Sequence, residues 1–280
     1  MIYSSLKNKF GKYFIYIPLI LMAFLWSYPF IWMVSAAFKT QNEMFSSKLK
    51  LIPDTLNFDN FIRAWDKGNF DVYFRNSIIV TIAVVIIVLI ITSLSGYVLG
   101  RYDFFGKKSI IFALTISVMI PSVFTIIPVY ETLKEIGLSQ SMLGLILAES
   151  GGGHIIFIML FSSFFKKIPK EIEEAAILDG CNFYQLYYKV MFPLSKPVIA
   201  TVVIMQFIWT WNSFLLPLVI TLNNPSLRTL SVGLYTLKGE NVVDWTGIAA
   251  GASIAVIPIV IVFIVFQKYF VSGIAGAVKD

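Results

Sequence analysis

Long apolar stretches alternate with shorter polar segments along the 280 residues of the chain. A helix crosses the hydrocarbon layer when about 20 mainly apolar residues run together, because unpaired backbone amides cannot be left in lipid. Six stretches meet this requirement: residues 13–38, 76–100, 109–130, 142–165, 197–222 and 246–270. The pattern predicts an all-α membrane protein whose six transmembrane helices make up a domain of residues 13–270.

The first apolar stretch also has features of a cleaved signal peptide. It follows Lys7, Lys9 and Lys12, and the letters SAA at Ser35 resemble a cleavage site. A signal peptide has an apolar core of about 7 to 15 residues, and this core is longer. We therefore expect a permanent span that follows a short cytoplasmic segment, residues 1–12.

Basic residues concentrate on one side of the predicted spans. The short outer loops hold only Lys134, Arg228 and Lys238 if the N-terminus is inside. The inner loops and ends then hold Lys7, Lys9, Lys12, Arg101, Lys107, Lys108, Lys166, Lys167, Lys170, Lys189, Lys196, Lys268 and Lys279. This asymmetry predicts that both termini are cytoplasmic, including a tail of residues 271–280.

The outer segment of residues 39–75 is not a simple linker. Its apolar side chains Phe58, Phe61, Ile62 and Trp65 recur at helical spacing. We expect a small amphipathic cap on the outer face.

The composition agrees with a membrane protein. The chain is 58% hydrophobic and 14% charged, with a mean hydropathy of +0.80, whereas a soluble domain is about 25% charged. The net charge of +6 fits cytoplasmic loops and contact with anionic membrane lipids, so no nucleic-acid partner is expected. The single cysteine, Cys181, excludes an intramolecular disulfide and a thiolate metal site built from this chain alone.

A long polar segment, residues 166–196, separates the fourth and fifth predicted spans. Pro169 can open a helix, and Gly180 suits the position just past its end, where a left-handed backbone is needed. Asn182 can cap a second helix that Pro193 and Pro197 close. The first helical turn carries acidic residues that suit the helix dipole, namely Glu171, Glu173 and Glu174.

This segment has two possible surroundings. Ala175 and Ala176 form a flank with almost no side chain, which would let the helix sit deep in a groove of another protein. The alternative is a helix that lies flat on the bilayer. Anionic lipid would repel the acidic cluster, and two alanines offer little apolar area to insert, so a protein groove is favoured.

The letters EAAILDGCNFYQLYYKVMFP, residues 174–193, resemble the EAA loop of ABC-importer permeases, except that Phe192 stands where leucine is usual. In that family the loop is a coupling helix that docks into a cleft on a cytoplasmic ATPase subunit. The resemblance implies that the ATPase-coupling residues are Glu173, Glu174, Ala175, Ala176, Asp179 and Gly180.

The rest of the chain resembles the carbohydrate-uptake branch of these permeases, the MalG-like subunits of maltose transporters. The similar segments are FIWTWNSF (207–214), RTLSVGLYTL (228–237) and QKYFVSGIAGAVKD (267–280). Ser213 replaces the usual acid, which puts the role of that acid in doubt, and Asp280 stands where glycine is common. The resemblance implies the type I ABC importer permease fold in a bacterial plasma (inner) membrane.

The same resemblance implies the partners. They are a second homologous permease subunit, two cytoplasmic ATPase subunits that bind ATP and magnesium, and an extracellular sugar-binding protein. The binding protein would dock on the outer loops, including residues 39–75 and 223–245, and the tail of residues 272–280 would reach the ATPases. The chain itself is expected to hold no cofactor or metal, since GRYDFFGKKS (100–109) has the wrong spacing for a phosphate loop.

An enzymatic role is not expected. The predicted spans contain no paired aspartates, no Gly-x-Ser-x-Gly and no His-Glu-x-x-His, and His154 is the only histidine. The alternatives that remain are a permease for another solute, such as glycerol-3-phosphate, and a membrane scaffold that does not transport.

Polar side chains at membrane depth are expensive and usually line a water-filled path. The candidates are Glu149, Gly152 and His154 in the fourth span and Gln206, Trp209, Asn212 and Ser213 in the fifth. Gln206, Trp209 and Ser213 are predicted to share one helical face, with Asn212 beside it. No Lys or Arg lies inside a predicted span, so a neutral oligosaccharide suits the path better than a phosphate-bearing cargo.

Three features of the spans leave alternatives open. The glycines at 151–153 can break the fourth helix or allow tight packing. Trp209 is deep enough to stack on a sugar, whereas Trp211 can belong to the path or to an interfacial belt. The prolines inside spans are expected to be fixed bends, mostly, and are Pro18, Pro29, Pro121, Pro128, Pro217 and Pro258.

Overall fold

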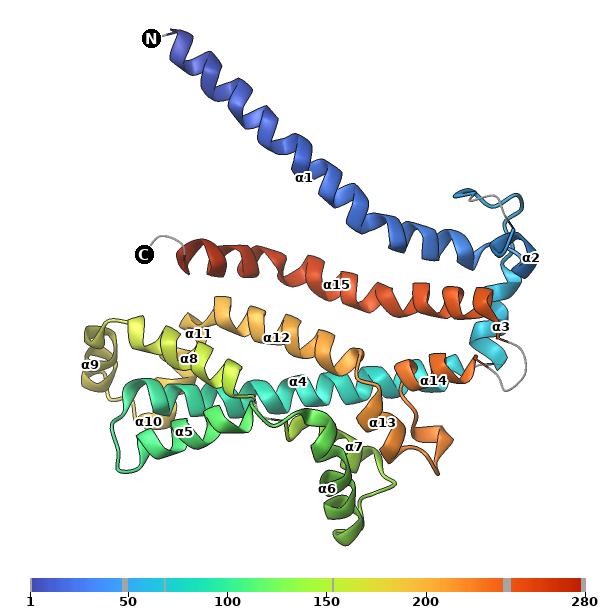
Figure 1. Cartoon of the computed structure of the whole chain (residues 1–280). Helices are drawn as coiled ribbons and strands as arrows, with labels where there is room; N and C mark the ends of the chain where they lie inside the picture. The colour runs from blue at the N-terminus through green and yellow to red at the C-terminus, as the bar shows by residue number, and fades with distance from the viewer. Residues whose placement is uncertain (1, 47–49, 68, 153, 239–242, 278–280) are drawn as a thin grey trace. The chain divides into compact units, whose positions relative to one another are not determined.

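The computed structural model describes the backbone of residues 2–46, 50–67, 69–152, 154–238 and 243–277, and the side chains of these residues except 2–15, 67 and 269–277. The side chains of Lys7, Lys9 and Lys12, and residues Gly153, Lys279 and Asp280, therefore lie outside the described part. Within it, all regular secondary structure is helical, as predicted. The helices, labelled in Figure 1, are α1 (Ile2–Ala37), α2 (Gln41–Met44), α3 (Asp59–Lys67), α4 (Phe70–Arg101), α5 (Lys107–Ser117), α6 (Ser122–Glu135), α7 (Met142–Ser150), α8 (Ile155–Lys167), α9 (Lys170–Leu178), α10 (Phe183–Leu186), the π-helix η1 (Tyr187–Met191), α11 (Phe192–Leu194), α12 (Lys196–Trp211), α13 (Leu215–Ile220), the 3-10 helix η2 (Pro225–Leu227), α14 (Leu230–Thr236) and α15 (Trp245–Ala277).

Three of these helices are long and apolar enough to cross a membrane individually. They are Tyr16–Ala37, Phe70–Arg101 and Trp245–Lys268, and three bent pairs of shorter helices bring the total among the described residues to as many as six. In the helix Tyr16–Ala37, none of the residues in its most apolar 18-residue stretch is buried. The number six itself stays a prediction.

The chain divides into two compact units, residues 1–70 with 234–256, and residues 71–233 with 257–280. In the first unit, small residues let α1, α3 and α15 approach closely: Ala36, Ala37, Ala64, Ala249 and Ala250 form one buried cluster. The Nδ2 of Asn60 donates to the carbonyls of Ala37 and Lys39, at 2.8 Å each. The cap segment is therefore tied to the end of α1.

An ion pair also fixes α3. The Nε of Arg63 lies 3.2 Å from a carboxylate oxygen of Asp244, next to the start of α15. Partial burial raises the pKa of Asp244, but hydrogen bonds from Arg63 and from the Gly247 amide outweigh it, so the net pKa is lowered. Asp244 therefore stays ionised and holds the pair.

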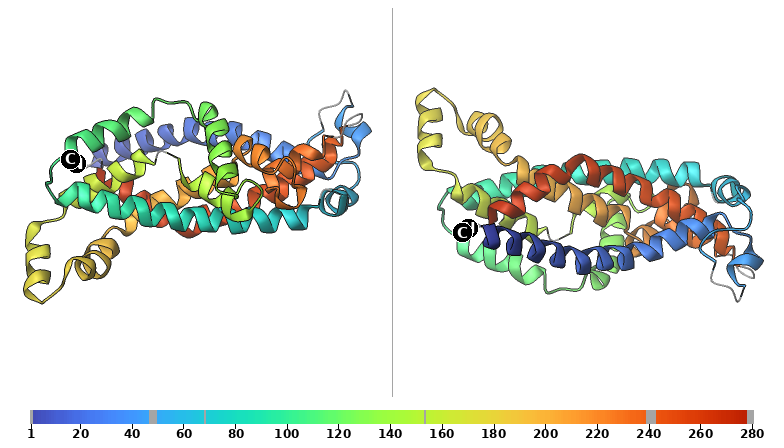
Figure 2. Two further views of the ribbon diagram at one scale, coloured as in Figure 1. Left: turned by 90° about the horizontal axis from the view of Figure 1, so that it is seen from below. Right: turned by 90° about the horizontal axis from the view of Figure 1, so that it is seen from above.

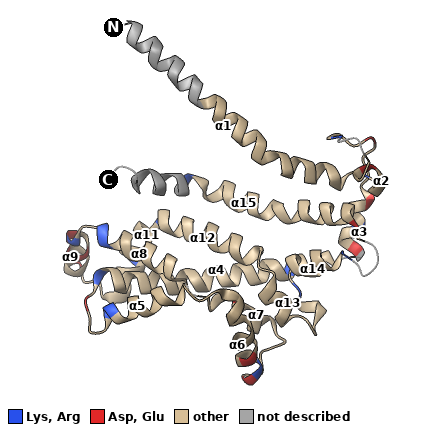
Figure 3. Cartoon of the chain, viewed as in Figure 1, with Lys and Arg blue, Asp and Glu red and all other residues tan. Residues whose placement is uncertain are grey.

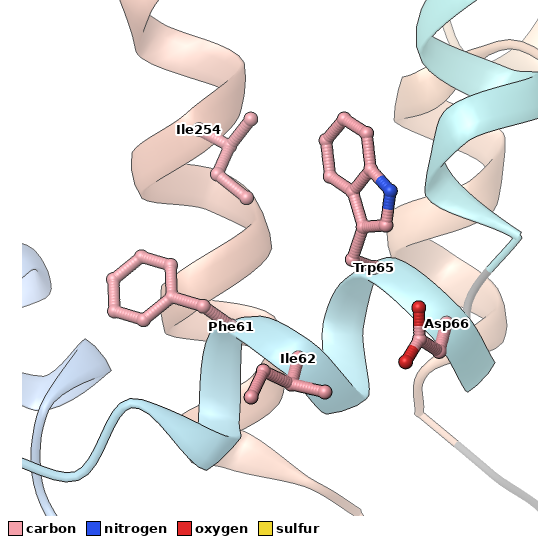
Figure 4. A pocket seen from close by; sticks show the side chains of 5 residues that line it. All are labelled: Phe61, Ile62, Trp65, Asp66 and Ile254. Carbon is pink, nitrogen blue, oxygen red and sulfur yellow. The ribbon is translucent and has the colours of Figure 1, made fainter.

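The predicted amphipathic helix exists, and the face that it buries carries small or polar residues. Asn60 and Ala64 face inward, whereas Phe58, Ile62 and Trp65 are 59%, 56% and 41% exposed. The reason is that close packing on α1 requires small or hydrogen-bonded side chains. The bulky ones turn outward, and Phe61, Ile62, Trp65 and Asp66 of α3 line an open pocket of about 440 Å³ with Ile254 of α15 (Figure 4).

The second unit has its core where α4, α8 and α12 pack together. The buried side chains come from α4 (Val80, Val84, Val88, Tyr97), α8 (Phe157, Phe161, Phe165) and α12 (Val198, Val202). Gly96 and Gly100 lie on one face of α4 and bring its backbone against α8. A Cβ added at Gly96 would lie 2.8 Å from the Ile158 carbonyl oxygen, and one at Gly100 would lie 2.9 Å from that of Ser162.

Gly96→Leu is expected to separate α4 from α8 and to lower the stability of the protein. Overpacking of a well-filled core costs about 1–3 kcal/mol, and small residues at this spacing are the usual means of close helix contact in membranes. Thermal unfolding in detergent should show a lower Tm than the wild type. Ile86→Phe adds bulk on the same helix at a position that is 51% exposed, and it should leave the Tm unchanged; an equal fall in both variants would contradict the prediction.

Three predicted spans are broken instead of straight. The fifth is broken where α12 ends at Trp211 and α13 begins at Leu215. The third bends by 104° between α5 and α6, where Pro121 is the N-cap residue of α6. The fourth bends by 56° between α7 and α8, next to Gly151 and Gly152. Pro18, Pro29, Pro128 and Pro258 lie inside continuous helices. Gly151 and Gly152 therefore mark a break of the fourth span. Pro217 lies within the short helix α13, so of the six prolines only Pro121 lies at a break.

Candidate functional site

The first candidate site is a helical hairpin at one end of the second unit. We call residues 170–186, which comprise α9, the turn and α10, the docking hairpin. Figure 2 shows that it stands out from the end of the bundle formed by α4, α8 and α12. Figure 3 shows basic residues at the same end, near α5, α8 and α9. The helix ends that lie there carry Arg101 (α4), Lys107 (α5), Lys166 (α8) and Lys170 (α9).

The turn of the docking hairpin is closed by backbone hydrogen bonds. Gly180 has φ of +85°, its N–H donates to the Ile177 carbonyl at 2.9 Å, and the Cys181 N–H donates to the Ala176 carbonyl at 3.0 Å. These two bonds form a Schellman motif, which satisfies the last carbonyls of α9. The predicted left-handed position of Gly180 is confirmed.

The second helix of the hairpin begins with a capping box, as Asn182 predicts. The Asn182 Oδ1 accepts from the Gln185 N–H at 2.9 Å, and the Gln185 Oε1 accepts from the Asn182 N–H at 3.0 Å. The helical structure that begins at Phe183 continues through η1 and α11 and ends at Leu194, between Pro193 and Pro197, as predicted. Proline lacks an amide donor and crowds the preceding turn, and the chain widens into the π-helix η1 directly before it.

The candidate coupling residues do not share one face of α9. Glu174, Ala175, Asp179 and Gly180 are exposed, but Ala176 is buried in the core of the second unit. The predicted flank of two alanines is therefore wrong, because neighbouring residues of a helix point about 100° apart. Two large apolar side chains at the hairpin tip, Ile177 and Leu178, are 57% and 87% exposed, and the sequence pattern does not single them out.

Glu173 points into the protein and not toward a partner. Its Oε2 lies 2.6 Å from the Nη2 of Arg101, and the two side chains are 16% and 5% exposed. The Nη1 of Arg101 donates to the carbonyls of Phe165 and Ile168, at 3.1 and 2.7 Å. One guanidinium thus joins the ends of α4 and α8 to α9.

A second contact joins α4 to the segment after α10. The hydroxyls of Ser93 and Tyr187 lie 2.7 Å apart. The fully buried ring of Tyr97 lies 5.7 Å from the Phe183 ring and 5.5 Å from the Tyr187 ring between centroids.

The second candidate site is a cavity of about 1400 Å³ within the second unit. Six of the seven candidate path residues line it: Glu149, Gly152, His154, Gln206, Trp209 and Ser213. Asn212 is the exception, since its exposed side chain donates from Nδ2 to the Ile208 carbonyl. Lining residues that the sequence analysis missed include Thr210 and Thr92, whose polarity alone does not distinguish them from buried helix residues.

Ser213 reaches the cavity in a different way from the one predicted. Helix α12 ends at Trp211, so Ser213 lies beyond it and shares no helical face with Gln206 and Trp209. Its hydroxyl donates to Glu149 Oε1 at 2.6 Å, which joins the segment after α12 to the end of α7. The serine that replaces an acid thus makes a hydrogen bond that two carboxylates could not make without a proton.

Aromatic rings form one wall of the cavity. Phe157 is fully buried and stacks on Trp209, with centroids 5.0 Å apart and an interplanar angle of 19°. Trp209 is 45% exposed, so its ring remains accessible from the cavity. Trp211, in contrast, is 3% exposed and stacks on Phe207, so it belongs to the core.

The polar groups of the cavity carry little charge. Glu149 and His154 are its ionisable lining side chains, and no Lys or Arg is among the lining residues. The Gln206 Nε2 donates to Thr210 Oγ1 at 2.9 Å, while its Oε1 has no hydrogen-bond partner. In the part of the chain that the structure describes, no three His, Cys, Asp or Glu side chains come together as a metal site.

Known proteins resemble the chain over most of its length. The profile of a family described as "Binding-protein-dependent transport system inner membrane component" matches residues 92–276. The diacetylchitobiose uptake system permease protein NgcG of Streptomyces coelicolor is 31% identical over 261 residues, covering 91% of this chain and 85% of that protein. The arabinooligosaccharides transport system permease protein AraQ of Halalkalibacterium halodurans is 33% identical over 262 residues, covering 92% of this chain and 93% of its own.

One solved structure shows the same fold. It belongs to a bacterial ABC transporter involved in the import of the acidic polysaccharide alginate, with a TM-score of 0.74 and 23% sequence identity. The match covers 94% of this chain and 98% of that one.

Proposed function

The chain belongs to the family of binding-protein-dependent transport system inner membrane components, and from this premise we propose that it forms half of the translocation path of an ATP-driven importer of neutral oligosaccharides. It is a multi-pass protein of the bacterial inner membrane and a transport component, not an enzyme. Its relatives are permeases for sugar uptake. The cargo, the coupling element and the individual partners are the parts that we propose.

The observation that carries the coupling element is the apolar tip of the docking hairpin. Leu178 is 87% exposed and Ile177 is 57% exposed on a hairpin that stands out from the bundle. Side chains of this size gain free energy when another protein covers them. The partner would be one of two cytoplasmic ATPase subunits that bind ATP and magnesium, with Glu174, Asp179 and the small Ala175 at the contact.

The membrane arrangement follows from the same proposal. With six spans and both termini in the cytoplasm, the docking hairpin and the basic end of the second unit face the ATPases. The exposed apolar face of α1 is available to lipid or to the second, homologous permease. The sugar-binding protein would dock from outside on residues 39–75 and 223–245.

The cavity supports a neutral cargo. A sugar ring presents apolar C–H faces that stack on an aromatic ring, and Trp209 offers one. An anionic cargo is held most strongly by a cationic side chain, and the lining contains no Lys or Arg. The family alone does not decide this point, because the transporter of the similar structure imports an acidic polysaccharide.

The test is reconstitution with the ATPase and the solute-binding protein that are encoded beside this chain. We expect the ATPase to copurify with the permease pair, and ATP hydrolysis to rise when a binding protein loaded with a neutral oligosaccharide is added. Stimulation by glycerol-3-phosphate instead would favour a permease for that solute. Copurification without any stimulation by a loaded binding protein would favour a scaffold that does not transport.

A further inference from the structure

We propose that Arg101 is a positioning residue that fixes the docking hairpin to α4 and α8 and thereby carries its movement to the cavity. This inference rests on the proposed function, because it names the route by which the hairpin acts. Nothing in the sequence pattern singles out Arg101 from the other basic residues at this end. The structure singles it out by burial, since its side chain is 5% exposed.

The guanidinium of Arg101 makes three connections at once. Its Nη2 pairs with Glu173 at 2.6 Å, and its Nη1 donates to the carbonyls of Phe165 and Ile168. Those carbonyls lie at the C-terminal end of α8, where helix carbonyls lack intrahelical partners. The planar guanidinium can hold a carboxylate and carbonyls together, which an ammonium group does less well.

Helix α8 leads from this connection to the cavity. It has 13 residues, so at about 1.5 Å per residue it spans about 20 Å. Its other end begins after His154, which lines the cavity and lies 6.0 Å from the Phe157 ring between centroids. Gly96 and Gly100 have no side chains, which lets the backbone of α4 pack closely against α8. The two helices should therefore move together when the hairpin is displaced.

A second link to α4 is made by α10 of the docking hairpin and by η1 directly after it. Tyr187 bonds to Ser93, and the Phe183 ring packs on Tyr97, so residues 93–101 of α4 contact both sides of the turn. The Tyr97 hydroxyl also donates to Glu173 Oε1 at 3.4 Å. A hairpin held at two points cannot rotate freely about either one, so its displacement is passed to α4.

The experiment measures sugar molecules imported per ATP hydrolysed, in proteoliposomes that contain the whole transporter. Glu173→Gln and Arg101→Ala should each lower this ratio about fivefold or more, the usual lower size of a coupling between distant sites. The double variant should lose no more than the worse single one, since both remove the same link. Asp103→Ala removes a nearby surface pair with Lys107 and should keep the wild-type ratio.

The outcomes separate this inference from the proposed function. If the wild-type transporter shows no sugar-stimulated hydrolysis, the proposed function itself fails. If the wild type works and the variants give less assembled transporter with a normal ratio, Arg101 and Glu173 only stabilise the fold and the inference is overturned. Arg101→Lys keeps the charge but not the planar contacts; a lowered ratio in this variant supports the inference even if Arg101→Ala cannot be purified, and a normal ratio overturns it.

Discussion

Replacing Gly180 with valine is expected to abolish sugar uptake while leaving insertion of the chain into the membrane intact. Gly180 has φ of +85°, where a β-branched residue is a steric outlier. The left-handed conformation costs an L-residue about 1–2 kcal/mol. In the valine variant we expect the turn to leave this conformation, which changes the angle between α9 and α10. Uptake of labelled sugar into proteoliposomes, divided by the amount of assembled transporter, measures the effect.

The strain at Gly180 comes from the backbone and not from lack of space. No atom lies within 4 Å of the position that a Cβ would take. Gly180→Asn, Gly180→Ala and Gly180→Val should therefore lose uptake in that order, because asparagine tolerates the left-handed region best. Gly106 has the same φ, also in open space and outside the docking hairpin, so Gly106→Val should keep uptake per transporter; normal uptake by Gly180→Val would refute the role of the hairpin angle.

The sequence predicts the local part of the hairpin well because caps and turns depend on neighbouring residues. The position of Gly180 and the cap at Asn182 follow from the need to satisfy helix-end groups within a few residues. The ion pair of Arg101 with Glu173 joins residues 72 positions apart. Spacing along the chain cannot show such a pair, and the acidic first turn of α9 therefore reads as dipole stabilisation alone.

The sequence also predicts where helices form but not which of their faces is buried. The periodicity of Phe58, Ile62 and Trp65 correctly predicts a helix, but an apolar face can meet lipid or a partner as well as the chain's own core. Ala176 is buried and Ala175 is exposed, although the two residues are identical. Which of them faces inward depends on the direction in which α9 leaves α8, and this direction is set by tertiary contacts.

The sequence predicts several of the residues that line the cavity, but not how the helices bring them together. The cost of polar groups in lipid identifies Glu149, His154, Gln206 and Trp209 without any geometry. Their convergence depends on the break between α7 and α8 and on the end of α12 before Ser213. Glycine and proline patterns allow such breaks, whereas the bond between Ser213 and Glu149 fixes where the broken ends meet.

Trp209→Ala is expected to weaken sugar transport selectively, and Trp211→Ala to weaken the protein instead. Trp209 lines the cavity with its ring 45% exposed, so its loss should raise the KM for sugar uptake about tenfold, equivalent to about 1.4 kcal/mol of binding. Trp211 is 3% exposed and stacks on Phe207, and truncation of a buried tryptophan costs about 3–5 kcal/mol of stability.

The two variants, on the same turn of α12, separate the two roles. Trp209→Ala should assemble in normal amount with a raised KM. Trp211→Ala should assemble poorly, and the transporter that does assemble should have a normal KM. The opposite result, a raised KM in Trp211→Ala and none in Trp209→Ala, would place the sugar path on another face of α12.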